Sequence, residues 1–398
     1  MKSPVQLIYT LLFSILCALI PFTEQLQAIP NILLAILGLI FLLNLNKKDF
    51  KAVEISHWLY IGLCGFVFLG ILINQRFGDL SFAFRLLLPV ALVILSFPLK
   101  DKKRPLYFFL GGSLGMLLIS VINLVIHYIK FHSLKIDVGD EVNSLLLGER
   151  PYLGFIYLTS MLVCIYLQKF ERNKTRRTGL LILAAIFAGF IIFISARLSI
   201  LSLLLILSIS VFYSKNKIKT LIGSLGAGLI IVLILAFNPN FVKRLTAGFE
   251  IDPTKFENVL QLEPRYHIWE CSAQIIKDKG SPVLGFGFRN TIDYLADCYA
   301  HRDKFQNEEH QAYFVNSRFN THNQFLNFLM SGGWLSFLIF AAFFFLMLFK
   351  NHKSYLPFVM VSALFLFCIF ENILSRQLGA MLFGLIIAFV GLINSEKK

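Results

Sequence analysis

The sequence contains little charge for its length. Asp, Glu, Lys and Arg make up only 15% of its 398 residues, whereas 57% are hydrophobic, 42 are Phe, and the mean hydropathy is +0.72. No soluble domain needs so much apolar surface, so the composition predicts a polytopic membrane protein. The formal net charge of +14 fits basic cytoplasmic loops better than nucleic-acid binding, because no basic surface interleaved with aromatic residues is evident.

Cysteine is also scarce. Four of the six cysteines fall inside apolar runs, where a cysteine behaves as a small hydrophobic residue: Cys17, Cys64, Cys164 and Cys368. Only Cys271 and Cys298 lie in a polar segment. Two cysteines exclude a disulfide framework, although this pair could form one bridge in an oxidising compartment, and the sequence leaves that open.

Motifs of soluble enzymes are missing. The sequence has no Gly-x-Ser-x-Gly, phosphate-binding loop or dinucleotide fingerprint, and its histidines follow no known metal-ligand spacing. We therefore expect neither a metal nor a cofactor. The apolar stretch from Val5 to Phe22 lacks a small-residue cleavage site and is followed by more spans, so it is predicted to be a first membrane helix and not a removed signal.

Apolar runs long enough to cross a bilayer fill most of the chain. A membrane-spanning helix needs about 20 apolar residues, with a range of about 17 to 25. An all-α bundle of about twelve spans is predicted, and the seventh and eighth meet so closely that the number could change by one or two. The spans are Val5–Phe22, Ile29–Leu45, Ser56–Ile73, Leu80–Phe97, Leu106–Ile129, Pro151–Leu167, Leu180–Ser195, Leu198–Tyr213, Thr220–Phe237, Gln324–Phe349, Tyr355–Phe370 and Gln377–Ile393.

The predicted spans divide the chain into three parts, and the charges between them predict its orientation in the membrane. Residues 1–237 hold nine spans, 238–321 form a large polar loop, and 322–398 hold three more spans. With the N-terminus in the cytoplasm, the cytoplasmic segments carry twenty Lys and Arg, against six in the short loops on the other side. This bias predicts that both termini are cytoplasmic and that the large loop lies on the opposite side of the membrane.

The large polar loop is expected to be folded, because its acidic and basic residues nearly balance. Pro264 suits the first turn of a helix, which Gly280 and Pro282 end. A turn around Gly285 leads to Asn290-Thr291, the predicted cap of a second helix. We expect two amphipathic helices over the outer mouth of the bundle.

Charged and polar residues at the membrane edge are the candidates for chemistry. Arg197 opens the eighth span, although an arginine there could be an interfacial anchor. Arg265 and Trp269 share a helix face, and the arginine could bind an anion or cap its own loop. His322 and Asn323 open the tenth span and could equally form a helix-capping pair.

Further arginines lie near the same outer mouth. Arg85 is deeper in a span and needs a partner or a wet cavity. Glu371 and Arg376 flank the last outer turn and could simply pair with each other. Arg289 and Arg376, with Trp269 and Asn323, are the expected substrate-binding residues. Several guanidiniums suit a diphosphate, and a neutral imidazole suits taking a proton from a sugar hydroxyl, so an anionic lipid-linked substrate is predicted.

At this point the sequence resembles the O-antigen ligase and polymerase family of bacterial membrane glycosyltransferases. The resemblance covers about the C-terminal half, and it departs from the family at Ser199, where a Gly is usual, and at Ser331, where an acid is common. The matching pieces are Ile194-Ser195-Ala196-Arg197-Leu198-Ser199-Ile200-Leu201, Pro264-Arg265-Tyr266-His267-Ile268-Trp269, Pro282-Val283-Leu284-Gly285-Phe286-Gly287, Thr321-His322-Asn323-Gln324-Phe325-Leu326 with Ser331-Gly332-Gly333-Trp334, and Glu371-Asn372 through Gly379.

The resemblance implies a GT-C-like enzyme of the bacterial inner membrane. It would transfer glycan from an undecaprenyl-diphosphate carrier to a hydroxyl at the periplasmic face, without a metal. Arg197 and Arg265 would hold the diphosphate as catalytic groups, and His322 would orient or deprotonate the acceptor hydroxyl. The expected partners are the carrier-linked glycan, membrane lipids, and lipid A-core or a growing glycan as acceptor.

Three functions remain open from the sequence. A ligase acting on lipid A-core is favoured, because one large outer loop follows the ninth span and the loop at 134–150 is modest. A polymerase of O-antigen or exopolysaccharide is the close alternative. A polysaccharide or lipid transporter could also use outward arginines, but it is expected to show paired broken helices or repeats, and none is evident.

Overall fold

The computed structural model describes residues 3–44, 53–132, 140–237, 263–280, 282–302, 305 and 308–395. In this part of the chain, nine helices are long and apolar enough to cross a membrane, and three more are apolar but shorter. Each of the twelve predicted spans coincides with one of them, so the all-α polytopic prediction is confirmed. The principal helices of the bundle are α1 (Ser3–Leu19), α3 (Ala28–Leu43), α4 (Ile55–Ile73), α5 (Leu80–Ser96), α6 (Arg104–Phe131), α8 (Arg150–Leu167), α9 (Lys174–Phe193), α10 (Arg197–Tyr213), α11 (Lys217–Ala236), α18 (Gly333–Asn351), α19 (Tyr355–Phe370) and α20 (Gln377–Ser395).

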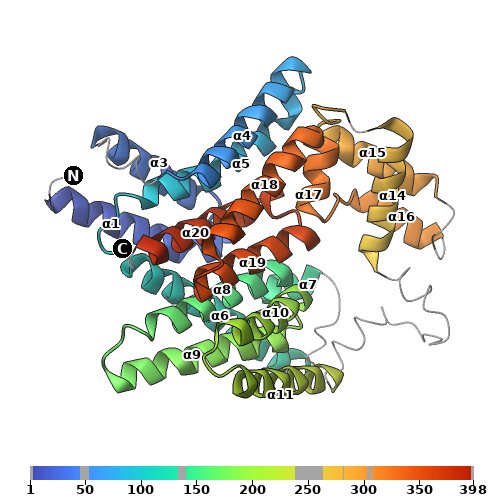
Figure 1. The fold of residues 1–398 in the computed structure, drawn as a ribbon. Helices are drawn as coiled ribbons and strands as arrows, with labels where there is room; N and C mark the ends of the chain where they lie inside the picture. Colours follow the sequence, from blue (N-terminus) through green and yellow to red (C-terminus); the bar gives the residue numbers. More distant parts are fainter. Residues whose placement is uncertain are drawn as a thin grey trace.

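The last helix lies at the centre of the bundle. α20 packs on α5 and α19, and nearly all of its side chains are buried. A side-chain carbon at Gly384 would lie 2.5 Å from the Cα of Pro89, so glycine is what permits α20 and α5 to approach this closely. In contrast, α11 lies at the rim, beside α9 and α10, and exposes most of its apolar residues, as a lipid-facing helix does (Figure 1).

The predicted tenth span is interrupted near its start. α17 (Gln324–Asn327) leads into a π-helical turn, η4 (Phe328–Gly332), before α18 continues to Asn351. Asn323 is the N-cap of α17, because its side-chain oxygen accepts a hydrogen bond from the Leu326 N–H at 2.9 Å. π-Helical turns are frequent at functional sites. This one begins at Phe328, six residues after His322.

Three helices form a small module outside the bundle, which we call the loop module: α14 (Pro264–Lys279), α15 (Phe288–Ala300) and α16 (Glu308–Ser317). In Figure 1 it lies beside α17, at one end of the bundle. The predicted helix from Pro264 to Gly280 is confirmed by α14. The expectation of two helices was wrong, because α16 is a third. Residues 238–262 of the predicted large loop lie outside the described residues.

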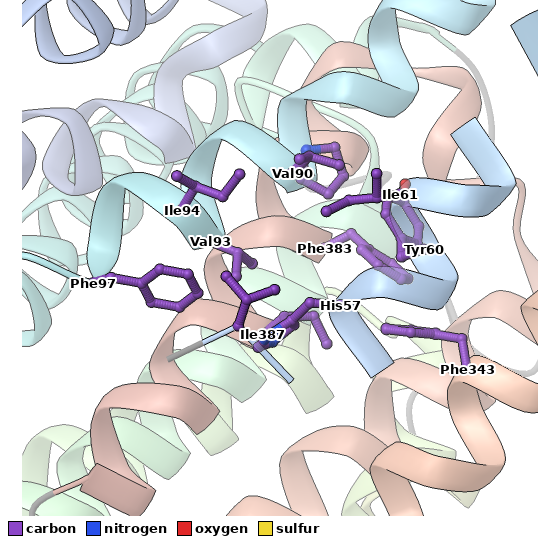
Figure 2. A pocket seen from close by; sticks show the side chains of 12 residues that line it. His57, Tyr60, Ile61, Val90, Val93, Ile94, Phe97, Phe343, Phe383 and Ile387 are labelled. Atoms are coloured by element: carbon purple, nitrogen blue, oxygen red, sulfur yellow. The ribbon is translucent and has the colours of Figure 1, made fainter. Parts of the chain in front are cut away.

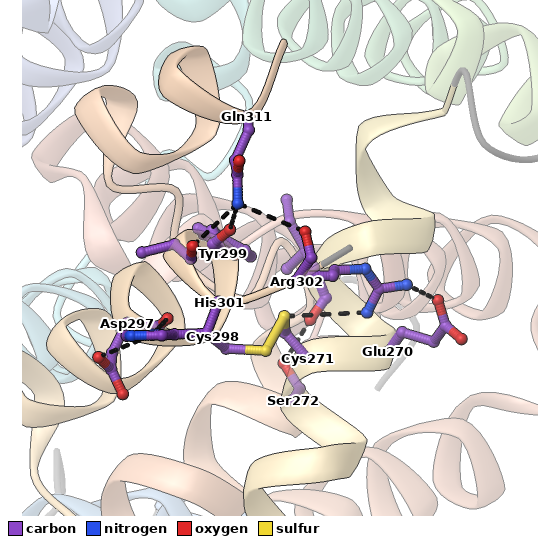
Figure 3. The surroundings of a disulfide bond; sticks show 11 residues. Glu270, Cys271, Ser272, Asp297, Cys298, Tyr299, His301, Arg302 and Gln311 are labelled. Atoms are coloured by element: carbon purple, nitrogen blue, oxygen red, sulfur yellow. Dashed lines mark hydrogen bonds and ion pairs between the residues drawn. A yellow bond between two sulfur atoms is a disulfide. The ribbon is translucent and has the colours of Figure 1, made fainter. Parts of the chain in front are cut away.

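The three helices of the loop module are tied together covalently and by hydrogen bonds (Figure 3). A disulfide joins Cys271 of α14 to Cys298 of α15, which settles the pairing that the sequence left open. The side-chain amide of Gln311, on α16, donates to the Tyr299 carbonyl at 2.9 Å. The shared apolar core includes the fully buried side chains Ile268, Leu295, Tyr299, Phe314 and Met330.

One buried carboxylate holds the loop module on the bundle. Asp79, at the start of α5, accepts hydrogen bonds from the backbone N–H groups of Phe288 and Arg289, each at 2.9 Å. These are the first N–H groups of α15, where the helix favours a negative charge. A side-chain carbon at Gly287 would lie 2.8 Å from the Asp79 carboxylate, and the backbone there has φ +91°, so glycine satisfies both conditions.

The start of α15 corrects a prediction. Asn290 and Thr291 were the expected cap, but α15 begins two residues earlier. Their side chains instead donate back to the carbonyls of Phe286, at 3.0 Å, and Gly287, at 2.7 Å. The capping carboxylate comes from Asp79, more than two hundred residues away in the sequence.

Candidate functional site

A buried carboxylate joins two of the predicted catalytic residues. Glu371 follows the last residue of α19, and one of its oxygens lies 2.7 Å from Arg265 Nη2 while the other lies 3.2 Å from His322 Nδ1. Arg265 also donates from Nε to the Phe370 carbonyl at 3.1 Å, at the C-terminal end of α19. These two contacts hold Arg265 in one orientation, because a planar guanidinium offers its donors in a fixed fork.

A second carboxylate joins Arg265 to Arg197. Glu263 immediately precedes α14, and its two oxygens lie 2.7 Å from Arg265 Nη1 and 3.1 Å from Arg197 Nη1. Arg197 is the first residue of α10, so the contact links α10 to the loop module. We call the set Arg197, Glu263, Arg265, Glu371 and His322 the arginine–histidine cluster. It draws residues from four separate parts of the chain.

The two carboxylates of the cluster differ in burial. The Glu371 side chain is 9% exposed and that of Glu263 is 35% exposed. Burial alone would raise the pKa of Glu371, but the hydrogen bond from His322 and the charge of Arg265 outweigh it, and the net pKa is lowered. Burial opposes the charge of Arg265 too, yet Glu371 and Glu263 together raise its pKa. Glu371 is therefore ionised, and Arg265 keeps its positive charge.

His322 lies in a backbone conformation that needs support from its neighbours. Its φ is +41°, which is uncommon for a residue with a side chain. Its N–H donates to the Asn320 side chain at 3.0 Å. The preceding carbonyl, that of Thr321, accepts from Trp269 Nε1 at 3.0 Å, and the following N–H, that of Asn323, donates to the Asn372 side chain at 2.9 Å. Trp269 and Asn372 thus position the imidazole from both sides.

The contact with Glu371 selects a tautomer for His322. An ionised carboxylate only accepts hydrogen bonds, so the neutral imidazole carries its proton on Nδ1 and leaves Nε2 as an acceptor. A histidine oriented by a carboxylate in this way can take a proton from a hydroxyl and stabilise the imidazolium that results.

Arg376 lies beside the arginine–histidine cluster but has other partners. Its guanidinium lies 2.6 Å from Glu149 and 3.5 Å from Glu24, and over the Tyr152 ring at 5.6 Å. The pairing of Glu371 with Arg376, which the sequence left as one possibility, is not formed. Each residue is instead satisfied by charges from distant segments, which a local sequence pattern does not reveal.

Two other arginines lie outside the cluster. Arg289 is an exposed residue of α15, and its side chain lies against Gly78 next to the Asp79 contact. Arg85, for which the sequence required a partner, donates to the carbonyls of Ser81, at 3.1 Å, and Ser375. It joins α5 to the last outer turn.

Sequence reasoning missed the two carboxylates of the cluster. Glu263 directly precedes Pro264-Arg265. Its position at the start of a helix was the only local feature that could have marked it as a candidate site residue. Glu371 was considered only beside Arg376. Recognising its role requires knowing that the start of α14, the turn at His322 and the end of α19 meet.

A separate pocket of the bundle shares no residue with the cluster. It is lined by apolar side chains of α4, α5, α18 and α20, including Tyr60, Phe343 and Phe383 (Figure 2). His57 is its one histidine, and His57 Nδ1 accepts from the Glu54 N–H at 3.1 Å in the first turn of α4. That contact gives His57 a helix-capping role. Among the described residues, no three His, Cys, Asp or Glu side chains are grouped as metal ligands.

Comparison with known proteins finds one family. A family model described as O-antigen ligase matches residues 182–341. The match includes Arg197, Glu263, Arg265 and His322, whereas Glu371 lies beyond it. A search of curated proteins found no match. The family resemblance noted from the sequence is thereby confirmed, and it agrees with the multi-pass helical fold of a bacterial inner-membrane protein.

Proposed function

Residues 182–341 belong to the O-antigen ligase family of glycosyltransferase-like enzymes, and from this premise we propose that the chain is an O-antigen ligase. It would transfer glycan from undecaprenyl diphosphate to a hydroxyl of lipid A-core. The observation that supports this proposal most is the arginine–histidine cluster, in which two guanidiniums and one carboxylate-oriented imidazole lie together.

The proposed reaction assigns one task to each kind of group. The acceptor hydroxyl attacks the sugar carbon bound to the diphosphate, the bond from that carbon to the diphosphate oxygen breaks, and the hydroxyl proton passes to His322 Nε2. Arg197 and Arg265 neutralise the charge on the departing diphosphate. Removal of one such preorganised donor slows a reaction by on the order of 10²–10³, which is the loss we expect for Arg265→Ala.

Glu371 is assigned a positioning role in this reaction. It holds His322 with Nε2 as the acceptor and fixes Arg265 at the same time. Trp269 and Asn323 support the turn that carries His322 and need no contact with substrate for that. For Arg289 and Arg376, a direct role in substrate binding remains a proposal, because the structure places both outside the cluster.

The orientation of the proposed enzyme follows from charge and chemistry. The loop module would lie in the periplasm and both termini in the cytoplasm, with residues 1–237 and 322–398 forming the membrane bundle. The Lys and Arg bias supports this arrangement. The Cys271–Cys298 disulfide supports it too, because disulfides persist in the oxidising periplasm.

Cells that lack the protein test the proposal. We expect long glycan to remain on the lipid carrier while lipid A-core stays bare on a gel stained for lipopolysaccharide. If the carrier instead holds single repeat units, the protein is the alternative in the same family, a polymerase. If both pools are unchanged, glycan transfer is contradicted and a transporter becomes the better hypothesis.

Variants test the assigned residues in the same assay. Arg265→Ala and His322→Ala should insert into the membrane normally and fail to restore long surface glycan. Arg318→Ala is the matched control, because Arg318 is also an arginine near the loop module but pairs with Asp293 at an exposed position. Normal glycan with either cluster variant would contradict the roles assigned here.

A further inference from the structure

We propose that Glu263 is a specificity-determining residue: it occupies the anion site between Arg197 and Arg265 until a diphosphate displaces it, and it excludes the single phosphodiester of anionic phospholipids. The inference rests on the proposed function, since it takes these two arginines as the diphosphate site. Glu263 would let the site distinguish the diphosphate donor from the anionic lipids that surround it.

Glu263 lies between the two guanidiniums in the position of a bridging anion. Glu263 binds the Nη1 atom of each arginine, at 2.7 Å on Arg265 and 3.1 Å on Arg197. Its carboxylate therefore bridges the two guanidiniums with two oxygens, as the oxygens of a bound phosphate group would. The space that Glu263 takes is the space in which both arginines can share one anion.

Glu263 can leave its site without releasing Arg265 from its other contacts. Its side chain is 35% exposed and makes no capping hydrogen bond to α14, although the residue occupies the N-cap position. Arg265 would keep its contacts with Glu371, at 2.7 Å, and with the Phe370 carbonyl, at 3.1 Å. Glu371 cannot exchange as easily, because it is buried and also binds His322.

Membrane lipids compete for the same anion site. Two arginines at the membrane edge are close to many anionic phospholipid headgroups, each with a single net negative charge. Such a headgroup would replace the single charge of Glu263 with an equal one and gain nothing. The diphosphate of a carrier lipid brings two charges and more acceptor oxygens, so it can replace the carboxylate with a net gain.

The test is diphosphate binding by the full-length protein in lipid nanodiscs. Geranylgeranyl diphosphate serves as the probe, and its dissociation constant is measured by calorimetry in pure phosphatidylcholine and in equal parts phosphatidylcholine and phosphatidylglycerol. The proteins are the wild type, Glu263→Gln, and Glu309→Gln as the control. Glu309 is an exposed carboxylate of the same module, so its change removes the same charge away from the cluster.

In phosphatidylcholine, Glu263→Gln should bind the probe roughly tenfold tighter than wild type, the ratio that corresponds to one competing charge-assisted hydrogen bond. In the mixed nanodiscs most of this gain should vanish, because phosphatidylglycerol now competes for the vacated site. The wild type and Glu309→Gln should both show only the smaller, equal loss that the negative surface potential causes.

The outcomes separate the two proposals. Suppose that the wild type binds the probe. If Glu263→Gln then binds it no tighter, the role of Glu263 is overturned while the diphosphate site stands. The same holds if phosphatidylglycerol lowers the affinity of Glu263→Gln for the probe no more than that of Glu309→Gln. If the wild type binds no diphosphate in either lipid, the proposed donor is contradicted and the role of Glu263 with it. A thermal unfolding scan in detergent confirms that each variant is folded.

Discussion

Replacing Glu371 by glutamine is the most informative change in the cluster, because it keeps the shape of the side chain and removes its charge. The carboxylate accepts from Arg265 Nη2 at 2.7 Å and contacts His322 Nδ1 at 3.2 Å. A glutamine offers one oxygen and one amino group, so it can accept from only one of these donors. Its amino group then faces the other donor.

The expected loss has two parts. Removing one partner of a buried ion pair destabilises a protein by about 3–5 kcal/mol. We expect the lower end, since Arg265 keeps its ion pair with Glu263 and its hydrogen bond to the Phe370 carbonyl. For catalysis, the change removes the carboxylate that selects the Nδ1-protonated tautomer of His322. We expect a loss on the order of 10²–10⁴ in kcat, by comparison with the aspartate that orients the catalytic histidine in serine proteases.

The assay is glycan transfer by the purified protein, from which kcat and KM for the donor are obtained. We expect Glu371→Gln to lower kcat while KM for the donor changes little, because the imidazole of His322 is no longer held in one orientation. The control is Glu270→Gln, which breaks the pair of Glu270 with Arg302 elsewhere on α14. If Glu371→Gln matches this control in kcat and in KM, the positioning role is refuted.

Three further predictions concern the loop module. Replacing Cys271 and Cys298 by serine should destabilise it by about 3–4 kcal/mol, from the chain entropy of a loop with a sequence separation of 27, as measured by limited proteolysis. Asp79→Asn should remove one of two charge-assisted hydrogen bonds to the start of α15, a loss of about 1.5–3 kcal/mol, and speed hydrogen exchange at Phe288 and Arg289. Burial lowers the pKa of His310, so the unfolded module binds more protons than the folded one below about pH 6.5. The contribution of neutral His310 to the stability of the loop module is therefore complete above that pH and is lost as the pH falls toward the folded pKa. His310→Gln should abolish this pH dependence of the thermal unfolding temperature.

The membrane helices could be predicted from sequence because their signal is local. Long apolar runs need no partner to be recognised, and the Pro264 to Gly280 boundaries of α14 follow from the same kind of local rule. Even the close meeting of α9 and α10 before Arg197 was placed correctly, since a short polar interruption separates the two runs.

The details that failed depend on contacts between distant residues. α15 starts at Phe288 because Asp79 supplies a carboxylate from the bundle. Glu371 and Arg376 are five residues apart, yet one turns to Arg265 and the other to Glu149. The arginines and the histidine could be named individually from their positions at span ends, whereas the carboxylates that connect them become visible only when the fold is known.

We propose that the arginine–histidine cluster transfers glycan from a diphosphate carrier. The most direct measurement combines purified protein, undecaprenyl-diphosphate-linked glycan and lipid A-core in one vessel and follows the joined product on a gel. We expect product with the wild type and with Arg318→Ala, and almost none with Arg265→Ala or His322→Ala. Product formation by both cluster variants at the wild-type rate would contradict it.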